Sequence, residues 1–332
     1  MMNLTRRSTA SLDNIKQPIA AELKDFGKFF RDAMRSRVGL IDLIARYIVR
    51  QKGKRVRPIL VFLSAKACGE VNDSTFRAAT LVEILHTATL IHDDVVDDAD
   101  TRRGLASINA VWKNKVAVLM GDYLLSRGLL LSLDNNDYTF LRCTSNAVKR
   151  MSEGELLQIQ KSRQLNIDEE TYLKIISDKT ASLLSTCTEI GAASTTQDAG
   201  RRQQMRDFGE HVGMAFQIRD DLLDYLGRRS IIGKPTGTDL KEKKLTLPLI
   251  HALSKGPRSD AKQAIRIIKN GAKQKDVRWV IDFVKSMGGI EYSIERAMQF
   301  SDRARADLAT IPDSDSKEAL LEFVDFVMAR ES

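Results

Sequence analysis

Apolar residues recur at every third or fourth position along most of this 332-residue chain. That spacing gathers them on one face of a helix, so it predicts amphipathic α-helices. No stretch alternates apolar and polar residues for long, and no Asn-Gly or Asp-Gly turn joins strand-like runs, so strands are not expected. The clearest helical patterns cover residues 40–49, 76–94, 171–193, 205–226 and 316–330.

Short polar stretches that contain glycine, proline or aspartate interrupt the helical pattern. They divide the chain into roughly ten to thirteen helices. Asp168 is expected to begin one helix, and Asp315 with Glu318 resembles a capping box. None of the stretches is long enough to link two domains. The sequence therefore predicts one all-α domain over residues 1–332, with residues 1–20 as a mobile N-terminus.

Composition places the chain among soluble globular proteins, with 43% hydrophobic and 29% charged residues. The most apolar stretch, residues 116–133, carries Asp122 and Arg127, so a membrane span is not expected. Cys68, Cys143 and Cys187 are far apart and odd in number, which favours buried, reduced thiols. We expect a cytoplasmic protein, peripheral to the membrane at most.

Lysine and arginine outnumber aspartate and glutamate by 52 to 44, which gives a net charge of +8. Such a charge fits a nucleic acid, an anionic membrane face or anionic substrates as partners. Aromatic residues make up 6% and do not interleave with the basic ones. A nucleic-acid-binding surface is therefore not expected.

Two acidic clusters stand out because each one ends a long amphipathic segment. They are DDVVD at residues 93–97 and DDLLD at residues 220–224. Residues four apart share a helix face, so Asp93 lies beside Asp97 and Asp220 beside Asp224. Each cluster alone could be a solvated patch, but the surrounding residues are strongly apolar. The side chains expected on or near these two faces are Asp93, Asp94, Asp97, His86, Asp220, Asp221, Asp224 and Gln217.

Unpaired carboxylates in apolar surroundings are unstable unless a cation compensates them. Mg²⁺ fits best, because it binds one or two carboxylates together with substrate phosphates and water. Zinc would require more histidine or cysteine nearby. A calcium-binding helix-loop-helix would require a glycine turn among the carboxylates.

Basic residues gather in several short segments near these clusters or along the chain. Arginine forks and lysine ammonium groups are the usual ligands of diphosphates. Together with the aspartates they suggest one diphosphate bridged by metal and another held by basic side chains alone. The basic residues in question are Lys54, Arg55, Arg57, Arg102, Arg103, Lys179 (next to Thr180), Lys234 and Lys244.

In this order the motifs resemble those of the trans-isoprenyl diphosphate synthases, most of all long-chain members such as octaprenyl diphosphate synthases. The matching segments are GKRVRP, EILHTATLIHDDVVDDADTRRG, GDYLL, EGELLQ, KTASLL, FQIRDDLLDY and GKPTGTDLKEKKLTLP, from Gly53 to Pro248. Lys52 departs from the family pattern, which has a second glycine there. The resemblance implies a helical bundle around a deep central cavity, usually in a homodimer.

The resemblance also implies a role for each motif residue. Three Mg²⁺ ions would be bound, two by Asp93 and Asp97 and one by Asp220, with support from Asp94, Asp221 and Asp224. Arg102, Lys179, Thr180, Gln217, Lys234 and Lys244 would contact the allylic diphosphate. Lys54, Arg57, His86 and Arg103 would hold isopentenyl diphosphate.

The implied reaction is a magnesium-dependent prenyl transfer. The allylic diphosphate ionises, the double bond of isopentenyl diphosphate attacks the cation, and a proton is lost, so no Ser-His-Asp set is needed. In this family, bulky residues one turn before the first aspartate stop elongation early. Ala88 and Thr89 stand there and are small, so a long all-trans product is expected.

Four other functions are compatible with parts of the pattern. A short-chain farnesyl or geranylgeranyl diphosphate synthase would share the same motifs. A terpene cyclase usually lacks the GKRVRP segment and His86, and a non-catalytic partner subunit usually loses one aspartate cluster; both clusters and the segment are intact here. A helical nucleic-acid binder would show salt-dependent binding and no magnesium-dependent turnover.

Overall fold

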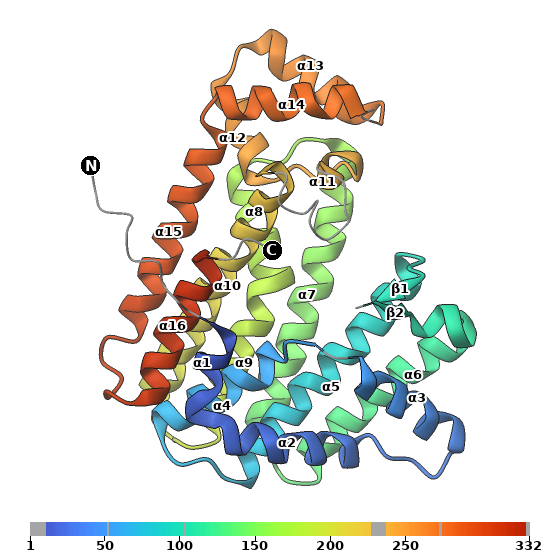
Figure 1. Cartoon of the computed structure of the whole chain (residues 1–332), viewed down its shortest axis with the longest axis vertical. Coiled ribbons are helices and arrows are strands. Elements are labelled where there is room, and N and C mark those ends of the chain that lie inside the picture. Colours follow the sequence, from blue (N-terminus) through green and yellow to red (C-terminus); the bar gives the residue numbers. More distant parts are fainter. Residues whose placement is uncertain (1–10, 52, 103, 227–236, 272–273, 330–332) are drawn as a thin grey trace.

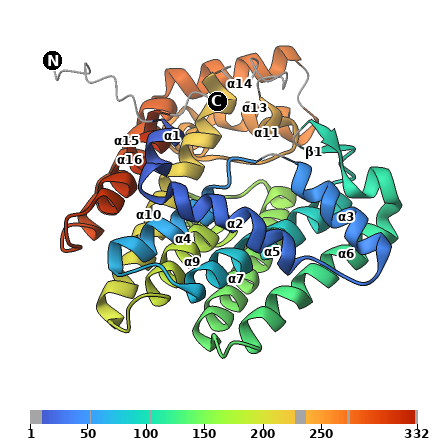
Figure 2. The ribbon, with the colours of Figure 1, turned by 60° about the horizontal axis from the view of Figure 1, so that its bottom comes forward.

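The structure, a computed structural model, describes residues 11–51, 53–102, 104–226, 237–271 and 274–329. These residues are almost entirely helical, which confirms the prediction of an all-α fold. Figure 1 shows long helices packed side by side, with α13 and α14 together at one end of the molecule. Figure 2 shows the same bundle turned so that its lower end comes forward.

The first half of the chain leads from short helices into three long ones. Its elements are α1 (Leu12–Lys16), the 3-10 helix η1 (Gln17–Ile19), α2 (Ala20–Ala33), α3 (Gly39–Arg50), α4 (Val56–Cys68), α5 (Asp73–Val96), β1 (Thr101–Arg102), β2 (Leu105–Ala106), α6 (Ile108–Leu133) and α7 (Tyr138–Gln164).

The second half continues the bundle and ends on two helices that cover it. Its elements are α8 (Glu169–Ile176), the π-helix η2 (Ser177–Ala181), α9 (Ser182–Ala193), α10 (Ala199–Leu226), α11 (Thr238–Lys241), α12 (Leu247–Lys255), α13 (Arg258–Lys269), α14 (Gln274–Ser286), α15 (Gly289–Asp307) and α16 (Asp315–Ala329).

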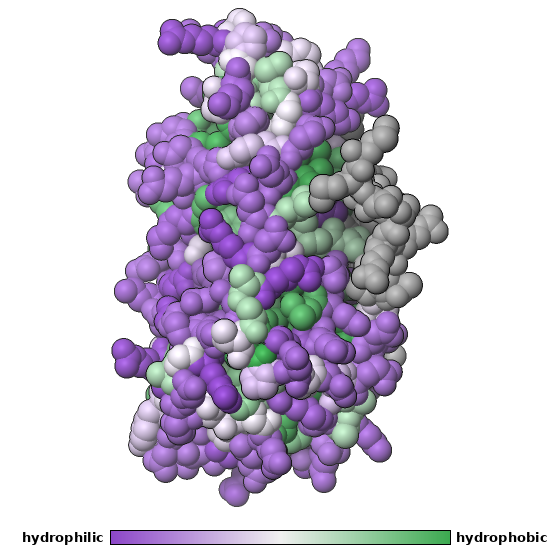
Figure 3. Space-filling model, turned by 90° about the vertical axis from the view of Figure 1, so that its left-hand side faces the viewer, coloured by the Kyte–Doolittle hydropathy of each residue, from purple (hydrophilic) through white to green (hydrophobic). Residues whose placement is uncertain are grey.

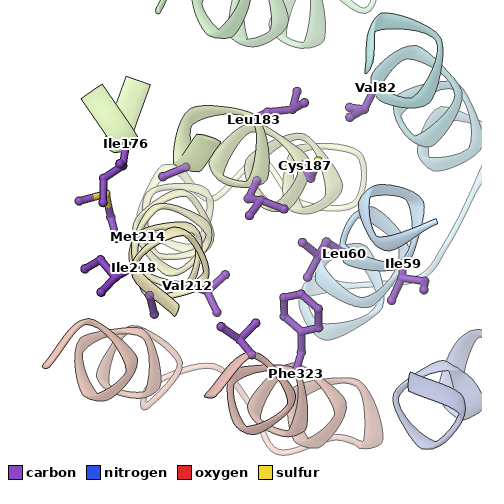
Figure 4. Packing of buried hydrophobic residues seen from close by; sticks show 14 of the residues in the cluster. Ile59, Leu60, Val82, Ile176, Leu183, Cys187, Val212, Met214, Ile218 and Phe323 are labelled. Carbon is purple, nitrogen blue, oxygen red and sulfur yellow. The ribbon is translucent and has the colours of Figure 1, made fainter. Parts of the chain in front are cut away.

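The core lies where α4, α9, α10 and α16 meet. Leu60, Val212 and Phe323 come from three different helices and point into the same space (Figure 4). All three side chains are fully buried or nearly so, and they belong to one contiguous cluster of buried residues. At about 25 cal/mol per Å² of apolar surface removed from water, such side chains each stabilise the fold by about 1.5–3 kcal/mol.

Glycines allow α9 to approach its neighbours closely. A Cβ atom on Gly191 would lie 2.4 Å from the carbonyl oxygen of Val61 on α4. A Cβ atom on Gly209 of α10 would lie 2.6 Å from the Cα atom of Ser185 on α9. These contacts involve backbone, which cannot move aside as a flexible side chain can. The close packing fixes the N-terminal half of α10, and the C-terminal half of the same helix carries the second aspartate cluster.

Two local expectations from the sequence differ from the structure. Residues 171–193, predicted as one helix, are divided by the π-helix η2 into α8 and α9. A two-stranded antiparallel ribbon, β1 with β2, follows the first aspartate cluster, although no strands were expected. Each strand has two residues, which is too short to show an alternation of apolar and polar residues.

Two expectations about helix termini can be checked in the same way. The Asp168 side chain caps α8 as expected, accepting the Thr171 N–H (2.8 Å). The capping expectation at Asp315 was wrong by one position. The hydroxyl of Ser314 accepts the Lys317 N–H (3.2 Å), so Asp315 is the first helical residue.

The N-terminal stretch is only partly described. Residues 1–10 lie outside the described residues. Residues 12–19, expected to be mobile, form α1 and η1 instead, with Ile15 and Ile19 fully buried. Packing of these two side chains fixes this part of the stretch.

The surface is unevenly polar. Figure 3 shows the face on the left of Figure 1, where α15 and α16 lie, as largely hydrophilic with small hydrophobic patches. Among the described residues, α6 alone has the length and composition of a membrane span, which is weak evidence by itself. One side of α6 packs along α5, and Arg127 donates to the carbonyl oxygen of Ala33 (3.0 and 3.1 Å). Its other side exposes Val111, Val118, Leu119, Leu130 and Leu133.

Substitution of Gly209 by alanine is expected to destabilise the fold by about 1–3 kcal/mol, because overpacking forces two helix backbones apart. Denaturant unfolding followed by circular dichroism measures the change. Gly39→Ala is the matched control, since it adds the same methyl group where no atom lies within 4 Å. Equal stability of the two variants would contradict the close approach of α9 and α10.

Candidate active site

A cavity of about 560 Å³ lies between α7, α8, η2, α10 and α11. It brings together side chains from both acidic clusters and from the basic segments, although they are far apart in the sequence. The predicted site residues that line it are Asp97, Lys179, Thr180, Gln217, Asp220, Asp221 and Lys244.

The first aspartate cluster lies at the C-terminal end of α5. Asp97 caps this helix, and its N–H bonds to the carbonyl oxygen of Asp93 (2.8 Å). Partial loss of solvent raises the pKa of Asp93, and the nearby carboxylates of Asp97 and Glu155 raise it further. Lys179 and Arg102 act in the opposite direction but do not cancel the effect. Burial and neighbouring carboxylates therefore disfavour the charged form of Asp93, whereas Asp97 is the residue of this cluster that lines the cavity.

A chain of hydrogen bonds crosses the base of the cavity to the second cluster. The Thr180 hydroxyl donates to Gln217 Oε1 (2.9 Å), and Gln217 Nε2 donates to Asp221 Oδ1 (2.8 Å). The Tyr172 hydroxyl donates to Asp221 Oδ2 (2.7 Å). Asp221 is almost fully buried, and this burial, together with the Asp239 carboxylate, raises its pKa to about 7. The chain fixes the orientation of Gln217 and Thr180 toward the cavity.

The π-helix η2 presents Lys179 and Thr180 to the cavity. Lys179 Nζ forms an ion pair with Glu155 Oε2 (2.5 Å) across the cavity on α7. π-Helical turns are rare, and they often occur at functional sites because they redirect side chains. Here the turn places two consecutive polar residues at the cavity wall between two apolar helices.

A buried ion pair holds this π-helix from behind. Arg150 of α7 donates to Asp178 Oδ1 (2.8 Å) and to the Ser177 hydroxyl (2.7 Å). It also makes a two-pronged contact with Glu210 of α10 (2.8 and 3.1 Å). Asp178 directly precedes Lys179 and is 2% exposed. The arginine therefore ties α7, η2 and α10 together beside the cavity.

The second aspartate cluster divides into different environments. Asp220 is half-buried and faces the cavity. Asp224 is 1% exposed and accepts the N–H groups of Thr238 (3.1 Å) and Asp239 (3.1 Å). Asp224 thus fixes the start of α11, and with it the chain that leads to Lys244.

A second, smaller cavity of about 50 Å³ lies next to α5 and the start of α4. His86, Arg55 and Arg102 line it, and so does Asp94. Arg102 Nε donates to Asp94 Oδ1 (2.7 Å), and Asp94 is 3% exposed. The first arginine after the aspartate cluster therefore lies beside His86 and contacts Asp94. It is still close enough to Asp93 to lower the pKa of that carboxyl.

Some predicted residues line neither of these two cavities, or cannot be placed. Lys54 is exposed, and Arg57 is half-buried on the first turn of α4. Arg103 and Lys234 lie outside the described residues. Thr89 is partly exposed and donates its hydroxyl to the carbonyl oxygen of His86 (2.9 Å).

Ala88 is 2% exposed on the face of α5 that packs against α6. Ile84 and His92, each four residues away on that face, approach Gly128 and Gly121 of α6. The small residue thus lies at the contact between α5 and α6, one turn below the first aspartate cluster.

Sequence reasoning missed three residues of the larger cavity and its surroundings. They are Tyr172, which holds Asp221; Asp239, which faces the cavity; and Glu155, which pairs with Lys179. Glu155 and Asp239 stand inside the matched motifs, so the motifs gave a signal. Arg55, which the sequence placed among the basic residues suited to a diphosphate, lines the smaller cavity. Tyr172 gave none, because its contact with Asp221 spans 49 positions.

The donor set suits a hard cation that also binds its substrate. Within the described ranges, no three His, Cys, Asp or Glu side chains gather closely enough to hold a metal ion by themselves. Carboxylate oxygens do approach the cavity from two sides, at Asp97 and at Asp220. Mg²⁺ commonly uses one or two carboxylates and takes its other ligands from phosphate and water. The residues present fit this mode of binding.

Comparison with known proteins agrees with the geometry. Residues 38–284 match the model of the polyprenyl synthetase family. The all-trans-nonaprenyl-diphosphate synthase (geranyl-diphosphate specific) of Rhodobacter capsulatus is 37% identical, over 96% of this chain and 97% of that protein. The octaprenyl diphosphate synthase of Escherichia coli is 35% identical, over 97% and 99%. The crystal structure of a polyprenyl synthase from Caulobacter crescentus, complexed with calcium and isoprenyl diphosphate, has a TM-score of 0.88 at 35% identity and covers 98% of this chain and 100% of that one.

The chain belongs to the polyprenyl synthetase family. The resemblance seen in the motifs is thereby confirmed, and so are the isoprenoid synthase fold and the class of enzyme, a trans-polyprenyl diphosphate synthase.

Substitution of Asp221 by asparagine is expected to change how stability depends on pH in the metal-free protein. The folded-state pKa of Asp221 is about 7, above its ordinary value of 3.8, so burial of this carboxyl is tolerated at low pH and disfavours folding as pH rises toward 7. The free energy of unfolding of Asp221→Asn should therefore rise relative to the unsubstituted protein between about pH 4 and 7, by about 1.4 kcal/mol per pKa unit, and then level off. Urea unfolding in the presence of a chelator measures it; a difference that stays constant over this range would rule out the buried carboxyl as its source.

Proposed function

We propose that the protein condenses an allylic diphosphate with successive molecules of isopentenyl diphosphate into a long all-trans polyprenyl diphosphate. The observation that carries this proposal is the larger cavity, where Asp97 and Asp220 from the two clusters line the same space as Lys179 and Lys244. Carboxylates and ammonium groups around one cavity suit a metal-bridged diphosphate, because each sign of charge has a partner in the ligand.

Magnesium ions would be held by Asp93 and Asp97 on one side and by Asp220 on the other. Asp94, Asp221 and Asp224 would support them. Asp94 would do so through its contact with Arg102, and Asp224 through its contact with the start of α11. When bound, the metal ions supply positive charge that stabilises the departing pyrophosphate. Raised pKa values at Asp93 and Asp221 support this assignment, because burial and neighbouring carboxylates disfavour their charged forms and a bound cation would offset both effects. The Caulobacter crescentus structure also contains a divalent cation, calcium, with its isoprenyl diphosphate.

The chain's own cations carry the rest of the ionisation step. Lys179, Lys244, Arg102 and Lys234 bind the allylic diphosphate and stabilise the negative charge that develops as the C–O bond breaks. The oxygens of Thr180 and Gln217, held in place by the hydrogen-bond chain from Tyr172, lie on the same wall. The proton lost after condensation passes to the departing pyrophosphate, so no separate base is required.

Isopentenyl diphosphate occupies the smaller cavity, which lies along α5 before Asp97. His86 and Arg55 line this cavity, and Lys54, Arg57 and Arg103 complete the diphosphate site. The cavity is narrow, about 50 Å³, so the diphosphate would bind at its mouth and widen it. Fixing both substrates beside α5 makes the bond-forming step effectively intramolecular.

A second copy of the chain is the proposed partner of α6. The exposed side of this helix carries the apolar residues named above, and the neighbouring helix α7 adds Leu156 and Ile159. Contiguous apolar surface of this kind usually marks an interface. Sedimentation at twice the mass of one chain is the expected result, and a monomer would contradict this part of the proposal. Release of the long apolar product at a membrane surface fits the same activity.

Incubation of the purified protein with Mg²⁺, labelled isopentenyl diphosphate and a short allylic primer should yield polyprenyl diphosphates. Asp220→Asn keeps the shape of the side chain but removes its charge, so turnover should fall by about 100-fold or more. Asp98→Asn is the matched control: Asp98 is exposed and has φ = +50°, a conformation that asparagine tolerates. Absence of condensation with every primer would refute the proposed activity, and equal turnover of the two variants would refute the role of Asp220.

Substitution of Ala88 by tyrosine should shorten the product, because a bulky ring one turn below Asp93 blocks the path of the growing chain. Product sizes are read by reversed-phase chromatography after removal of the diphosphate. Ala88→Ser, which adds a single atom, should leave the sizes unchanged. A folded tyrosine variant with unaltered products would show that Ala88 serves only the packing of α5 on α6.

A further inference from the structure

A third cavity, of about 670 Å³, lies between α7, α9 and α10. It shares no lining residue with the two cavities described above. Residues 139–150 of α7 and 199–206 of α10 line it, whereas these helices reach the active-site cavity through residues 158–162 and 217–223. Along α7 the nearest lining residues of the two cavities are eight positions apart (Arg150 and Gln158), and along α10 they are eleven positions apart (Arg206 and Gln217). The proposed reaction does not use this cavity.

Four arginines line this cavity, and only one of them is neutralised. Arg150 is paired with Asp178 and Glu210. For Arg142, Arg202 and Arg206, no carboxylate of the described residues lies within ion-pairing distance. One carboxylate, that of Glu189, lines the cavity with them. The lining therefore has an excess of positive charge.

The three unpaired arginines converge on the same place. Arg202 and Arg206 are four residues apart on α10, an arrangement in which like charges repel. Arg142 of α7 and Arg206 of α10 both lower the pKa of the Cys143 thiol, so both guanidinium groups approach that sulfur. Burial and the hydrogen bond to Glu189 still raise this pKa to about 12, so the thiol remains neutral and offers the arginines no negative charge.

Neutral polar groups line the same cavity and can donate hydrogen bonds to a ligand. The Thr139 hydroxyl and the Asn146 amide line the cavity and have no hydrogen-bond partner among the described residues. Thr139 stands in the first turn of α7, whose N-cap residue, Asp137, makes no side-chain capping bond. The Asp137 carboxylate accepts a hydrogen bond from Arg77 instead (Nε to Oδ2, 2.6 Å). The first N–H groups of α7 therefore remain available, and the helix dipole favours an anion there.

We propose that this third cavity binds an anion that carries two or more phosphate groups. Guanidinium groups from two helices can each contact a separate phosphate through paired N–H donors, which one carboxylate could not satisfy. The open cavity, about 670 Å³ against about 560 Å³ for the proposed substrate cavity, is large enough for an oligophosphate. A nucleic-acid strand is disfavoured, because no aromatic side chain lines the cavity for bases to stack on.

Isothermal titration calorimetry with inorganic pyrophosphate tests the proposal on the full-length chain. A chelator is present throughout, so that metal-dependent binding at the aspartate clusters does not contribute. Metal-independent binding at the basic residues of the substrate site is common to all three proteins, so the third cavity is read from the binding step that differs between them. The double variant Arg142→Gln, Arg206→Gln should bind pyrophosphate at least about tenfold more weakly than the unsubstituted protein. Arg163→Gln is the matched control, since Arg163 is an exposed arginine near the end of the same helix and outside the cavity. Equal pyrophosphate binding by all three proteins, together with equal adsorption of all three to the vesicles described below, would overturn the proposal.

Two further measurements complete the test. Vesicles of an anionic phospholipid are offered to the same proteins: adsorption that is lost in the double variant, while pyrophosphate binding is weak throughout, assigns the phosphates to lipid headgroups rather than to a free anion. If the double variant does not fold, pyrophosphate should protect Arg142 and Arg206 of the unsubstituted protein from an arginine-modifying reagent, and unprotected arginines would overturn the proposal. None of these measurements uses turnover, so their outcome is independent of the proposed reaction.

Discussion

Carboxylates of both aspartate clusters line one cavity, and the packing of the bundle holds these like charges there. Asp97 ends α5 and Asp220 belongs to α10, and both of these helices pack against α9. α10 approaches α9 closely at Gly209, and the core fills the space behind them, so the two carboxylates cannot move apart freely. Positive groups reduce the repulsion without removing it: Arg102 pairs with Asp94, and Lys179 pairs with Glu155. The result is a cavity lined by carboxylates, at Asp97 and Asp220, and by cations, at Lys179 and Lys244. A ligand of mixed charge, a metal-bound diphosphate, satisfies both kinds of charge at once.

The all-α fold class and the aspartates of the site could be predicted from the sequence, because both depend on the spacing of residues along a helix. A period of 3.6 residues reveals a helix wherever one face is buried, and residues four apart share a face in any helix. Asp97 and Asp220 could therefore be identified as site residues before their relative position was known. That they line one cavity follows from the way α5 and α10 pack, and the resemblance to a known family supplied this point, whereas spacing alone could not.

The features that sequence reasoning missed depend on contacts between distant segments or on backbone geometry. Tyr172 reaches Asp221 across 49 positions, and no local pattern distinguishes this tyrosine from a core residue. The π-helix at Lys179 differs from an α-helix by one extra residue in a turn, which leaves the apolar pattern of residues 171–193 nearly unchanged. The arginines of the third cavity are spread over α7 and α10, so in the sequence they resemble ordinary solvated residues. Each of these required the packing of whole helices to be known.

The two aspartate clusters have the same sequence pattern, yet the loss of different aspartates in a related protein would have different consequences. Asp224 accepts two backbone N–H groups at the start of α11, and Asp94 is bound to Arg102. A descendant that exchanged Asp220 would lose a side chain that faces the cavity and keep its architecture. One that exchanged Asp224 would instead release the segment that carries Lys244, and its inactivity would be a defect of assembly. The number of aspartates that remain in the two clusters therefore cannot distinguish a folded, inactive enzyme from a misfolded one. The position of the exchanged aspartate is what distinguishes them.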